Sequence, residues 1–313
     1  MSTETGLNGG TQAKQSLVTN ETISVGGLHM SYRHWRRATN SAAQNPPFLL
    51  IHGLASASRI WDLVAVELLK SGGSDLIALD QRGHGQSDKP DNGYSNDQIV
   101  ADDYALANLL KLEKPVVVGH SWGATIALAY AAKHPEAVSG LVLVDGGMGN
   151  MRSRPDLNDW EIVAKRLAPP EFAGTPRETF LDFYRRGPLG AIWNETLADI
   201  VLNIVQVRTD NTVAPRLSRA NHLQILRALW ESDNIELARQ VSCPMLMISA
   251  EADPSDDWAK AKREGAAQMQ AAARVAQVEF VAMPDTIHDI PLQRPAALAQ
   301  KIVEFGKAVG FLD

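Results

Sequence analysis

Short apolar runs recur along most of the chain, and segments with helical spacing of their apolar residues lie between them. The runs cover residues 48–51, 76–79, 116–118, 140–144 and 244–250. Uninterrupted apolar runs of this length are typical of strands that are covered on both faces. Because these strands alternate with helical segments, the pattern predicts a mostly parallel sheet with helices on both faces.

Three more strands complete the predicted sheet. Residues 22–25 and 28–32 alternate around Gly26-Gly27, which is the pattern of an antiparallel hairpin, and residues 275–283 form the last strand. The fold class expected is therefore α/β, with an eight-stranded, mostly parallel sheet. In such sheets ligands bind at the carboxyl ends of the strands.

Helices are expected between the strands. One spans residues 60–69, one follows the capping box Ser95-Asn96-Asp97-Gln98, and one spans residues 258–272. The last helix places Leu298 and Ile302 on one apolar face.

The alternation of strand and helix stops between about residues 148 and 236. This segment has apolar residues at helical spacing, such as Ile200, Ile204 and Val205, and no convincing strand. It also holds several of the large aromatic side chains, some of which we expect to line a cavity. The predicted organisation is a disordered polar tail, a core in two parts and an inserted helical lid: residues 1–20, 21–147 with 237–313, and 148–236.

Composition narrows the classes of partner. The 313 residues carry a net charge of −6 and no cluster of Lys and Arg, which argues against nucleic acid and against anionic membranes. We therefore expect a small neutral or apolar substrate. No apolar run approaches the ~20 residues of a membrane span, and residues 1–20 lack the pattern of a secretory signal, so a cytoplasmic location is expected. The oligomeric state is left open.

The sequence contains no signal for a metal site or for a cofactor-binding site. Cys243 is the only cysteine, which excludes an internal disulfide and a cysteine-based metal site. The His and carboxylate residues show no spacing typical of metal ligands. We expect neither a metal ion nor a cofactor.

The strongest chemical signal is Gly119-His120-Ser121-Trp122-Gly123, which stands between a Val run and an Ala-rich helix. A serine on a very tight strand-to-helix turn is exposed at the carboxyl edge of the sheet, and the glycines admit the neighbouring backbone. The amino end of the following helix also favours negative charge that develops beside this serine. Ser121 is therefore the candidate nucleophile.

A serine nucleophile needs a base within hydrogen-bond reach and a carboxylate that orients this base. His288 follows the last predicted strand and is the candidate base. Asp253 lies just beyond the preceding strand and is the preferred carboxylate. Asp145 also follows a strand and is the alternative.

These motifs resemble the α/β-hydrolase family, in its lidded esterase and lactonase-type branch. The resemblance rests on His52-Gly53, on Asp80-x-Arg82-Gly83-x-Gly85, on the motif around Ser121, and on Asp253 and His288, in this order. It covers almost the whole chain after the tail. It implies that the backbone N–H groups of Leu54 and Trp122 form an oxyanion hole.

The hypothesis is a serine hydrolase that cleaves a carboxylic ester or lactone through an acyl-enzyme. Ser at position 121 argues against a resemblance to haloalkane dehalogenases and epoxide hydrolases, which have aspartate there. Carbon–carbon bond hydrolases and perhydrolases use the same triad and remain as alternatives. A ligand receptor built on a hydrolase scaffold is the alternative from a different class.

Overall fold

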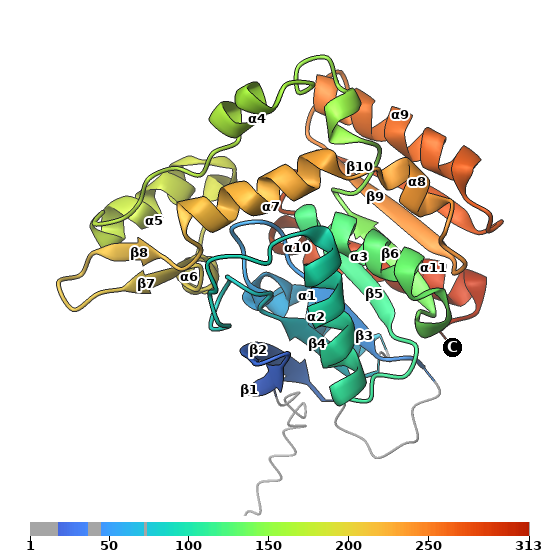
Figure 1. Cartoon of the computed structure of the whole chain (residues 1–313), viewed down its shortest axis with the longest axis horizontal. Coiled ribbons are helices and arrows are strands. Elements are labelled where there is room, and N and C mark those ends of the chain that lie inside the picture. The colour runs from blue at the N-terminus through green and yellow to red at the C-terminus, as the bar shows by residue number, and fades with distance from the viewer. Residues whose placement is uncertain (1–17, 37–44, 72–73, 313) are drawn as a thin grey trace, which may run out of the picture.

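The computed structural model describes residues 18–36, 45–71 and 74–312. Its centre is an eight-stranded sheet with the strand order β1-β2-β4-β3-β5-β6-β9-β10 (Figure 1). The strands are β1 Val18–Val25, β2 Leu28–Trp35, β3 Phe48–Ile51, β4 Leu76–Leu79, β5 Val116–His120, β6 Gly140–Val144, β9 Met245–Glu251 and β10 Val278–Pro284.

The sheet is mostly parallel, as predicted. The hairpin of β1 and β2 is antiparallel, and β2 also pairs antiparallel with β4, whereas all other neighbouring strands of this sheet pair in parallel. The carboxyl ends of β5, β6, β9 and β10 therefore reach the same edge of the sheet. The tail predicted at residues 1–20 lies outside the described residues as far as residue 17, and residues 18–20 belong to β1.

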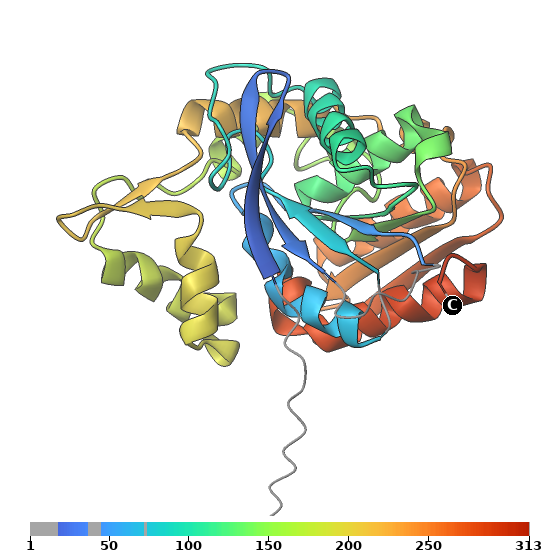
Figure 2. The same cartoon turned by 90° about the horizontal axis from the view of Figure 1, so that it is seen from below.

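Helices cover both faces of the sheet (Figure 2). Leu49 and Val117 point into one core, which the helices α2, α3 and α9 cover, while Phe48 and Val118 point into the other, under α1 and α11. Because successive residues of a strand face opposite sides, both faces of each central strand are apolar, which explains the uninterrupted runs in the sequence. These helices are α1 Asp62–Lys70, α2 Asn96–Leu109, α3 Trp122–Lys133, α9 Asp257–Ala272 and α11 Pro295–Val309.

Most local signals of the sequence match the observed elements. The side chain of Ser95 caps α2 by accepting a hydrogen bond from the Gln98 N–H at 3.3 Å. A 3-10 helix at Ser58–Trp61 precedes α1, and the short helices α8 and α10 span Asn234–Ala238 and Ile290–Gln293.

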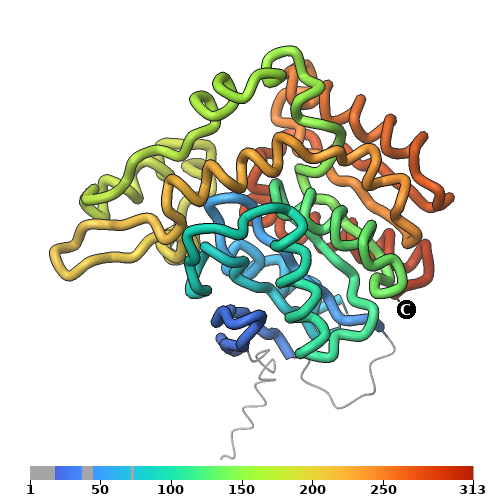
Figure 3. Tube along the Cα trace, viewed as in Figure 1, coloured from blue at the N-terminus to red at the C-terminus, as the bar shows by residue number. Residues whose placement is uncertain are grey.

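The segment between β6 and β9 leaves the sheet and returns to it, as the chain trace shows (Figure 3). It contains the helices α4 Trp160–Arg166, α5 Arg177–Arg186, α6 Glu195–Leu202 and α7 Arg219–Glu231. The expectation that this segment holds no strand is wrong, because β7 Val205–Val207 and β8 Val213–Pro215 form a small antiparallel sheet. Helix α6 ends at Leu202, so Ile204 and Val205 are not helical. Three-residue strands are too short for their alternation to stand out in a sequence.

Helix α7 runs across the upper side of the sheet in the view of Figure 1 and is hydrogen-bonded to the loop before α2. The amide of Asn221 donates hydrogen bonds to the Tyr94 hydroxyl and to the Pro90 carbonyl at 2.8 and 3.0 Å.

None of the helices in the described part of the chain has the length and apolar content that crossing a lipid bilayer requires.

Candidate active site

Ser121 stands at the sharp turn between β5 and α3. Its backbone has φ 55° and ψ −121°, a strained combination for a residue with a Cβ. The two glycines make this turn feasible. A Cβ on Gly119 would lie 2.1 Å from the Gly123 carbonyl oxygen, and one on Gly123 would lie 2.5 Å from the Ile51 carbonyl oxygen. The sequence prediction of a tight strand-to-helix turn is therefore confirmed.

Two hydrogen bonds place His288 between Ser121 and Asp145. The imidazole Nε2 lies 3.0 Å from the Ser121 Oγ, and Nδ1 lies 2.6 Å from the Asp145 Oδ2. These groups come from the ends of β5 and β6 and from the loop after β10. The arrangement is that of a nucleophile, a base and an orienting carboxylate.

The expectation that Asp253 orients the imidazole is wrong. Its exposed carboxylate accepts hydrogen bonds from the N–H and hydroxyl of Ser255. β9 continues to Glu251, and Asp253 lies in the turn that follows, where its carboxylate is hydrogen-bonded to Ser255 and not to His288. The alternative residue, Asp145, takes this place because β6 lies directly beside β5 in the sheet.

Asp145 is almost fully enclosed, with 4% of its side-chain surface exposed. Burial disfavours its charge, but the hydrogen bond and charge of His288, together with those of Lys262, lower the pKa of the Asp145 carboxyl. Half of the His288 side chain faces a cavity, with 53% of its surface exposed. Partial desolvation of the ring opposes protonation, yet the hydrogen bond and charge of Asp145 raise the pKa of the His288 imidazole above its usual value.

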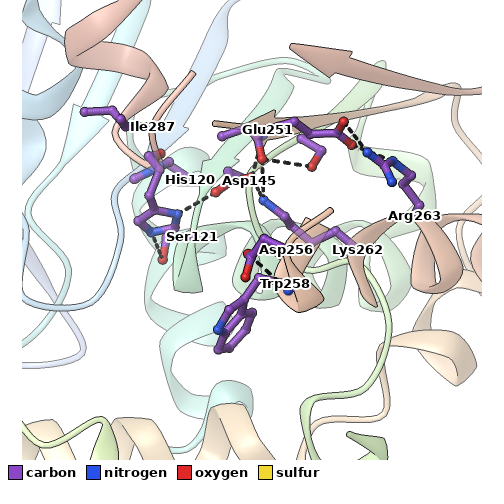
Figure 4. A network of polar contacts seen from close by, with 12 residues as sticks. His120, Ser121, Asp145, Glu251, Asp256, Trp258, Lys262, Arg263 and Ile287 are labelled. Carbon is purple, nitrogen blue, oxygen red and sulfur yellow. Dashed lines mark hydrogen bonds and ion pairs between the residues drawn. The ribbon is translucent and has the colours of Figure 1, made fainter. Parts of the chain in front are cut away.

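Lys262 is a part of this site that the sequence analysis missed. Its ammonium group donates hydrogen bonds to the Asp145 Oδ1 at 2.6 Å and to the Ala250 carbonyl at 2.7 Å (Figure 4). A signal was present in the sequence, since Lys262 lies at helical spacing between Ala259 and Ala266, which are both buried on one face of α9. A charged residue on the buried face of a helix requires a partner of opposite charge or a hydrogen-bonding group.

The remaining histidines near the site are structural. The His120 ring donates from Nε2 to the His288 carbonyl at 2.9 Å and so holds the loop after β10. Burial lowers the pKa of His120 to about 4, so this ring is neutral. His52 and His84 lie buried in tight loops and hydrogen-bond backbone groups there, as expected of turn residues.

The residues expected to form an oxyanion hole lie beside Ser121. Leu54 and Trp122 line the same cavity as the Ser121 and His288 side chains. Gly53 brings this loop close, because a Cβ on Gly53 would lie 3.0 Å from the Ser121 Cβ. The Leu54 and Trp122 N–H groups therefore lie on the two chain segments that flank the serine.

A cavity of about 1290 Å³ opens over Ser121 between the sheet edge and the inserted segment. The insertion contributes apolar side chains that include Met148, Leu226 and Leu229. A smaller cavity of about 120 Å³ lies on the other side of Ser121, and Tyr184 of the insertion lines it. Among the described residues, no cluster of His, Cys, Asp and Glu side chains has the arrangement of a metal site.

The fold and the site together define a class: an α/β sheet with a serine on a tight turn, paired with histidine and aspartate from neighbouring strand ends. The chain belongs to the α/β-hydrolase family, since the family model for the alpha/beta hydrolase fold matches residues 46–295.

Individual relatives match over shorter stretches. The 2-(acetamidomethylene)succinate hydrolase of Mesorhizobium japonicum is 38% identical over 100 residues, which is 32% of this chain and 35% of that protein. The proline iminopeptidase of Lactobacillus helveticus is 33% identical over 118 residues, or 36% of this chain and 40% of that protein. The matches thus span between a third and two fifths of the length of these relatives.

Similar folds occur among solved structures. The crystal structure of E-2-(acetamidomethylene)succinate hydrolase has a TM-score of 0.76 at 23% identity and covers 93% of this chain and 100% of that chain. The enol-lactonase from Burkholderia xenovorans LB400 has a TM-score of 0.65 at 20% identity, with coverages of 92% and 100%. At these identities the likeness concerns the fold.

Proposed function

We propose that the protein is a serine hydrolase that cleaves a carboxylic ester or lactone of a small, largely apolar substrate. The observation that carries this proposal is the continuous hydrogen-bonded chain from Ser121 through His288 to Asp145. A serine hydroxyl alone is a poor nucleophile at neutral pH, and an oriented imidazole removes this limit.

The reaction proceeds in two steps. The Ser121 Oγ attacks the substrate carbonyl carbon while His288 Nε2 takes the hydroxyl proton, and the N–H groups of Leu54 and Trp122 bind the oxyanion. The carbon–oxygen bond to the leaving alcohol then breaks, and the alcohol takes the proton from His288. In the second step, a water molecule gives a proton to His288 and attacks the acyl carbon. The bond from this carbon to the Ser121 Oγ then breaks, Oγ takes the proton back from His288, and the acid is released.

The two cavities on either side of Ser121 accommodate the two parts of such a substrate. The large one, about 1290 Å³, has room for a bulky group, and the small one, about 120 Å³, fits only a few heavy atoms. We propose that the inserted segment, residues 148–236, serves as the lid over both. Apolar side chains of the insertion, such as Leu226 and Leu229, favour an apolar group of the substrate, while charged side chains such as Arg154 line another part of the large cavity.

A paired serine and imidazole favours an enzyme over a receptor that only binds its ligand. Covalent labelling by a fluorophosphonate distinguishes the two, because the reagent requires an activated serine. We expect the wild type to be labelled at Ser121 and to release p-nitrophenol from short acyl esters.

Ser121→Ala should lose both the labelling and the turnover by a factor of at least ~10³ while its thermal unfolding stays unchanged. Ser139→Ala is the control and should retain full labelling, because Ser139 lies just before the amino end of β6, at the edge of the sheet opposite Ser121. Full activity of the Ser121→Ala protein, or no labelling of the wild type, contradicts the proposed function. A panel of esters, lactones and amides run with the wild type then identifies the substrate class.

A further inference from the structure

The Asp145 carboxylate takes part in three hydrogen bonds, and its two oxygens have different partners. Oδ2 faces the His288 Nδ1 at 2.6 Å, whereas Oδ1 accepts from the Ala250 N–H at 2.7 Å and from the Lys262 ammonium group at 2.6 Å. Lys262 also donates to the Ala250 carbonyl. One lysine side chain thus joins the carboxylate at the end of β6 to the backbone at the end of β9.

The side chain of Lys262 is mostly buried. Only 16% of its side-chain surface is exposed, against 4% for Asp145. The next residue, Arg263, makes a separate pair with the buried Glu251, and Figure 4 shows the two cations of α9 pointing to different carboxylates. Of these two carboxylates, the one bound by Lys262 is hydrogen-bonded to the imidazole of His288.

We propose that Lys262 is a positioning residue of the active site, which fixes the Asp145 carboxylate and offsets part of its charge, so that the His288 imidazole releases its proton more readily and can accept the Ser121 proton. This inference rests on the proposed function for its catalytic meaning. Its geometric and electrostatic content is independent of it.

The charge balance gives the physical reason. The negative charge of Asp145 favours a proton on the imidazole, and the positive charge of Lys262 opposes it. Without Lys262 the enclosed carboxylate lacks a counter-ion, and the nearest group that can become positive is the imidazole at 2.6 Å. His288 then holds its proton up to a higher pH, so a smaller fraction of the imidazole is available as a base at neutral pH.

The other groups that face the imidazole do not replace Lys262. His120, on β5, lies with its ring centroid 4.9 Å from that of His288 and is neutral. Asp289, in the same loop, carries negative charge and favours protonation of His288, as Asp145 does. Tyr184, on α5, lines the small cavity beside His288, and burial raises the pKa of its hydroxyl to about 12, so it is uncharged. Lys262 is therefore the cation that opposes protonation of the imidazole.

The test follows the His288 ring directly. In protein labelled with ¹³C at histidine Cε1, the His288 signal is assigned from its loss in His288→Gln, and its titration midpoint is measured by NMR. In Lys262→Met the midpoint should rise by about one pH unit or more, because a unit charge next to the pair is removed. The pH below which the fluorophosphonate labelling rate falls should rise by the same amount.

Three variants make the result specific. Lys262→Arg keeps the charge and should restore the wild-type midpoint, whereas Lys262→Gln keeps a hydrogen-bond donor without charge and should behave as Lys262→Met. Arg263→Met removes the neighbouring cation from an equally buried carboxylate and should leave the midpoint unchanged. This matched control separates the proposed role from a loss of stability.

Two results overturn the inference: an unchanged His288 midpoint in folded Lys262→Met or Lys262→Gln, or an equal shift in Arg263→Met. A wild type that is not labelled overturns the proposed function instead. The NMR midpoints still decide about Lys262 in that case, since they require no turnover.

Discussion

At the scale of single residues, the imidazole of His288 is the point where three chain segments meet. Asp145 fixes its Nδ1 and leaves Nε2 to face Ser121. Because Nδ1 donates to a carboxylate, the neutral ring presents an acceptor at Nε2, which is the tautomer that proton removal from serine requires. The orientation of one ring therefore depends on one carboxylate.

Replacing Asp145 by Asn should lower turnover of a p-nitrophenyl ester by about 10³- to 10⁴-fold, since an amide no longer fixes this tautomer or stabilises the imidazolium. Asp253→Asn is the comparison variant and should keep most of the wild-type turnover, because the Asp253 carboxylate, which also lines the large cavity, hydrogen-bonds Ser255 and not His288. Steady-state kinetics of both variants, with circular dichroism to verify folding, check this expectation. Loss of activity in Asp253→Asn with full activity in Asp145→Asn would falsify the assignment.

At the scale of elements, the turn between β5 and α3 packs closely against the backbone of neighbouring segments. Gly123 lies against the carboxyl end of β3, and Gly146, after β6, lies against Ser121, so that a Cβ there would be 2.1 Å from the Ser121 carbonyl oxygen. A third close contact joins Gly149 to Gly265 of α9, where a Cβ on Gly149 would be 2.9 Å from the Gly265 Cα. The glycine-rich stretch after β6 therefore serves packing around the serine.

Gly123→Ala should destabilise the protein although alanine favours a helix by ~1 kcal/mol over glycine. The added Cβ would lie 2.5 Å from the Ile51 and His52 carbonyl oxygens, and strand β3 must move to admit it. We expect the free energy of unfolding to fall by about 1–3 kcal/mol and the labelling rate of Ser121 to fall with it.

The control for this variant is Gly187→Ala, at the end of α5. The nearest atom to its added Cβ is the Phe183 carbonyl oxygen at 3.3 Å, and its φ is −86°. Its free energy of unfolding should stay within about 1 kcal/mol of the wild type in urea denaturation. Equal stabilities of the Gly123 and Gly187 variants would disprove the steric argument.

At the scale of the whole molecule, buried charge makes stability depend on pH. Arg82 pairs with Asp102 at 2.6 Å, whereas the neighbouring Asp103 is fully buried and neither of its carboxyl oxygens has a hydrogen-bond partner among the described residues. Burial, reinforced by the charge of Asp102, raises the pKa of Asp103 well above its usual value. The folded protein therefore holds a proton that the unfolded chain releases.

The sign of the pH effect follows from this difference. Above the usual pKa of 3.8, the unfolded state binds fewer protons than the folded state, so the contribution of Asp103 to stability falls as pH rises toward its folded pKa. Asp103→Asn, which has no proton to lose, should gain stability relative to the wild type by about 1.4 kcal/mol per pH unit in that range.

Urea denaturation of the wild type and of Asp103→Asn at several pH values from 4 upward measures this gain. Asp97→Asn serves as the control, because 81% of the Asp97 side chain is exposed, and its stability relative to the wild type should not vary in this way. A difference between Asp103→Asn and the wild type that stays constant with pH would refute the argument.

The sequence by itself determined the elements whose signals are local. Continuous apolar runs marked the buried strands, Ser95 marked the start of α2, and the glycines around Ser121 marked the tight turn. Tertiary structure alone decided between the two carboxylates. Asp145 and Asp253 both follow strands, and no local feature distinguishes them, but the turn after β9 leads Asp253 into solvent while the pairing of β5 with β6 brings Asp145 to His288. The Lys262 contact depended on the same arrangement, because it joins α9 to Asp145, which follows β6 and lies 117 residues earlier in the chain.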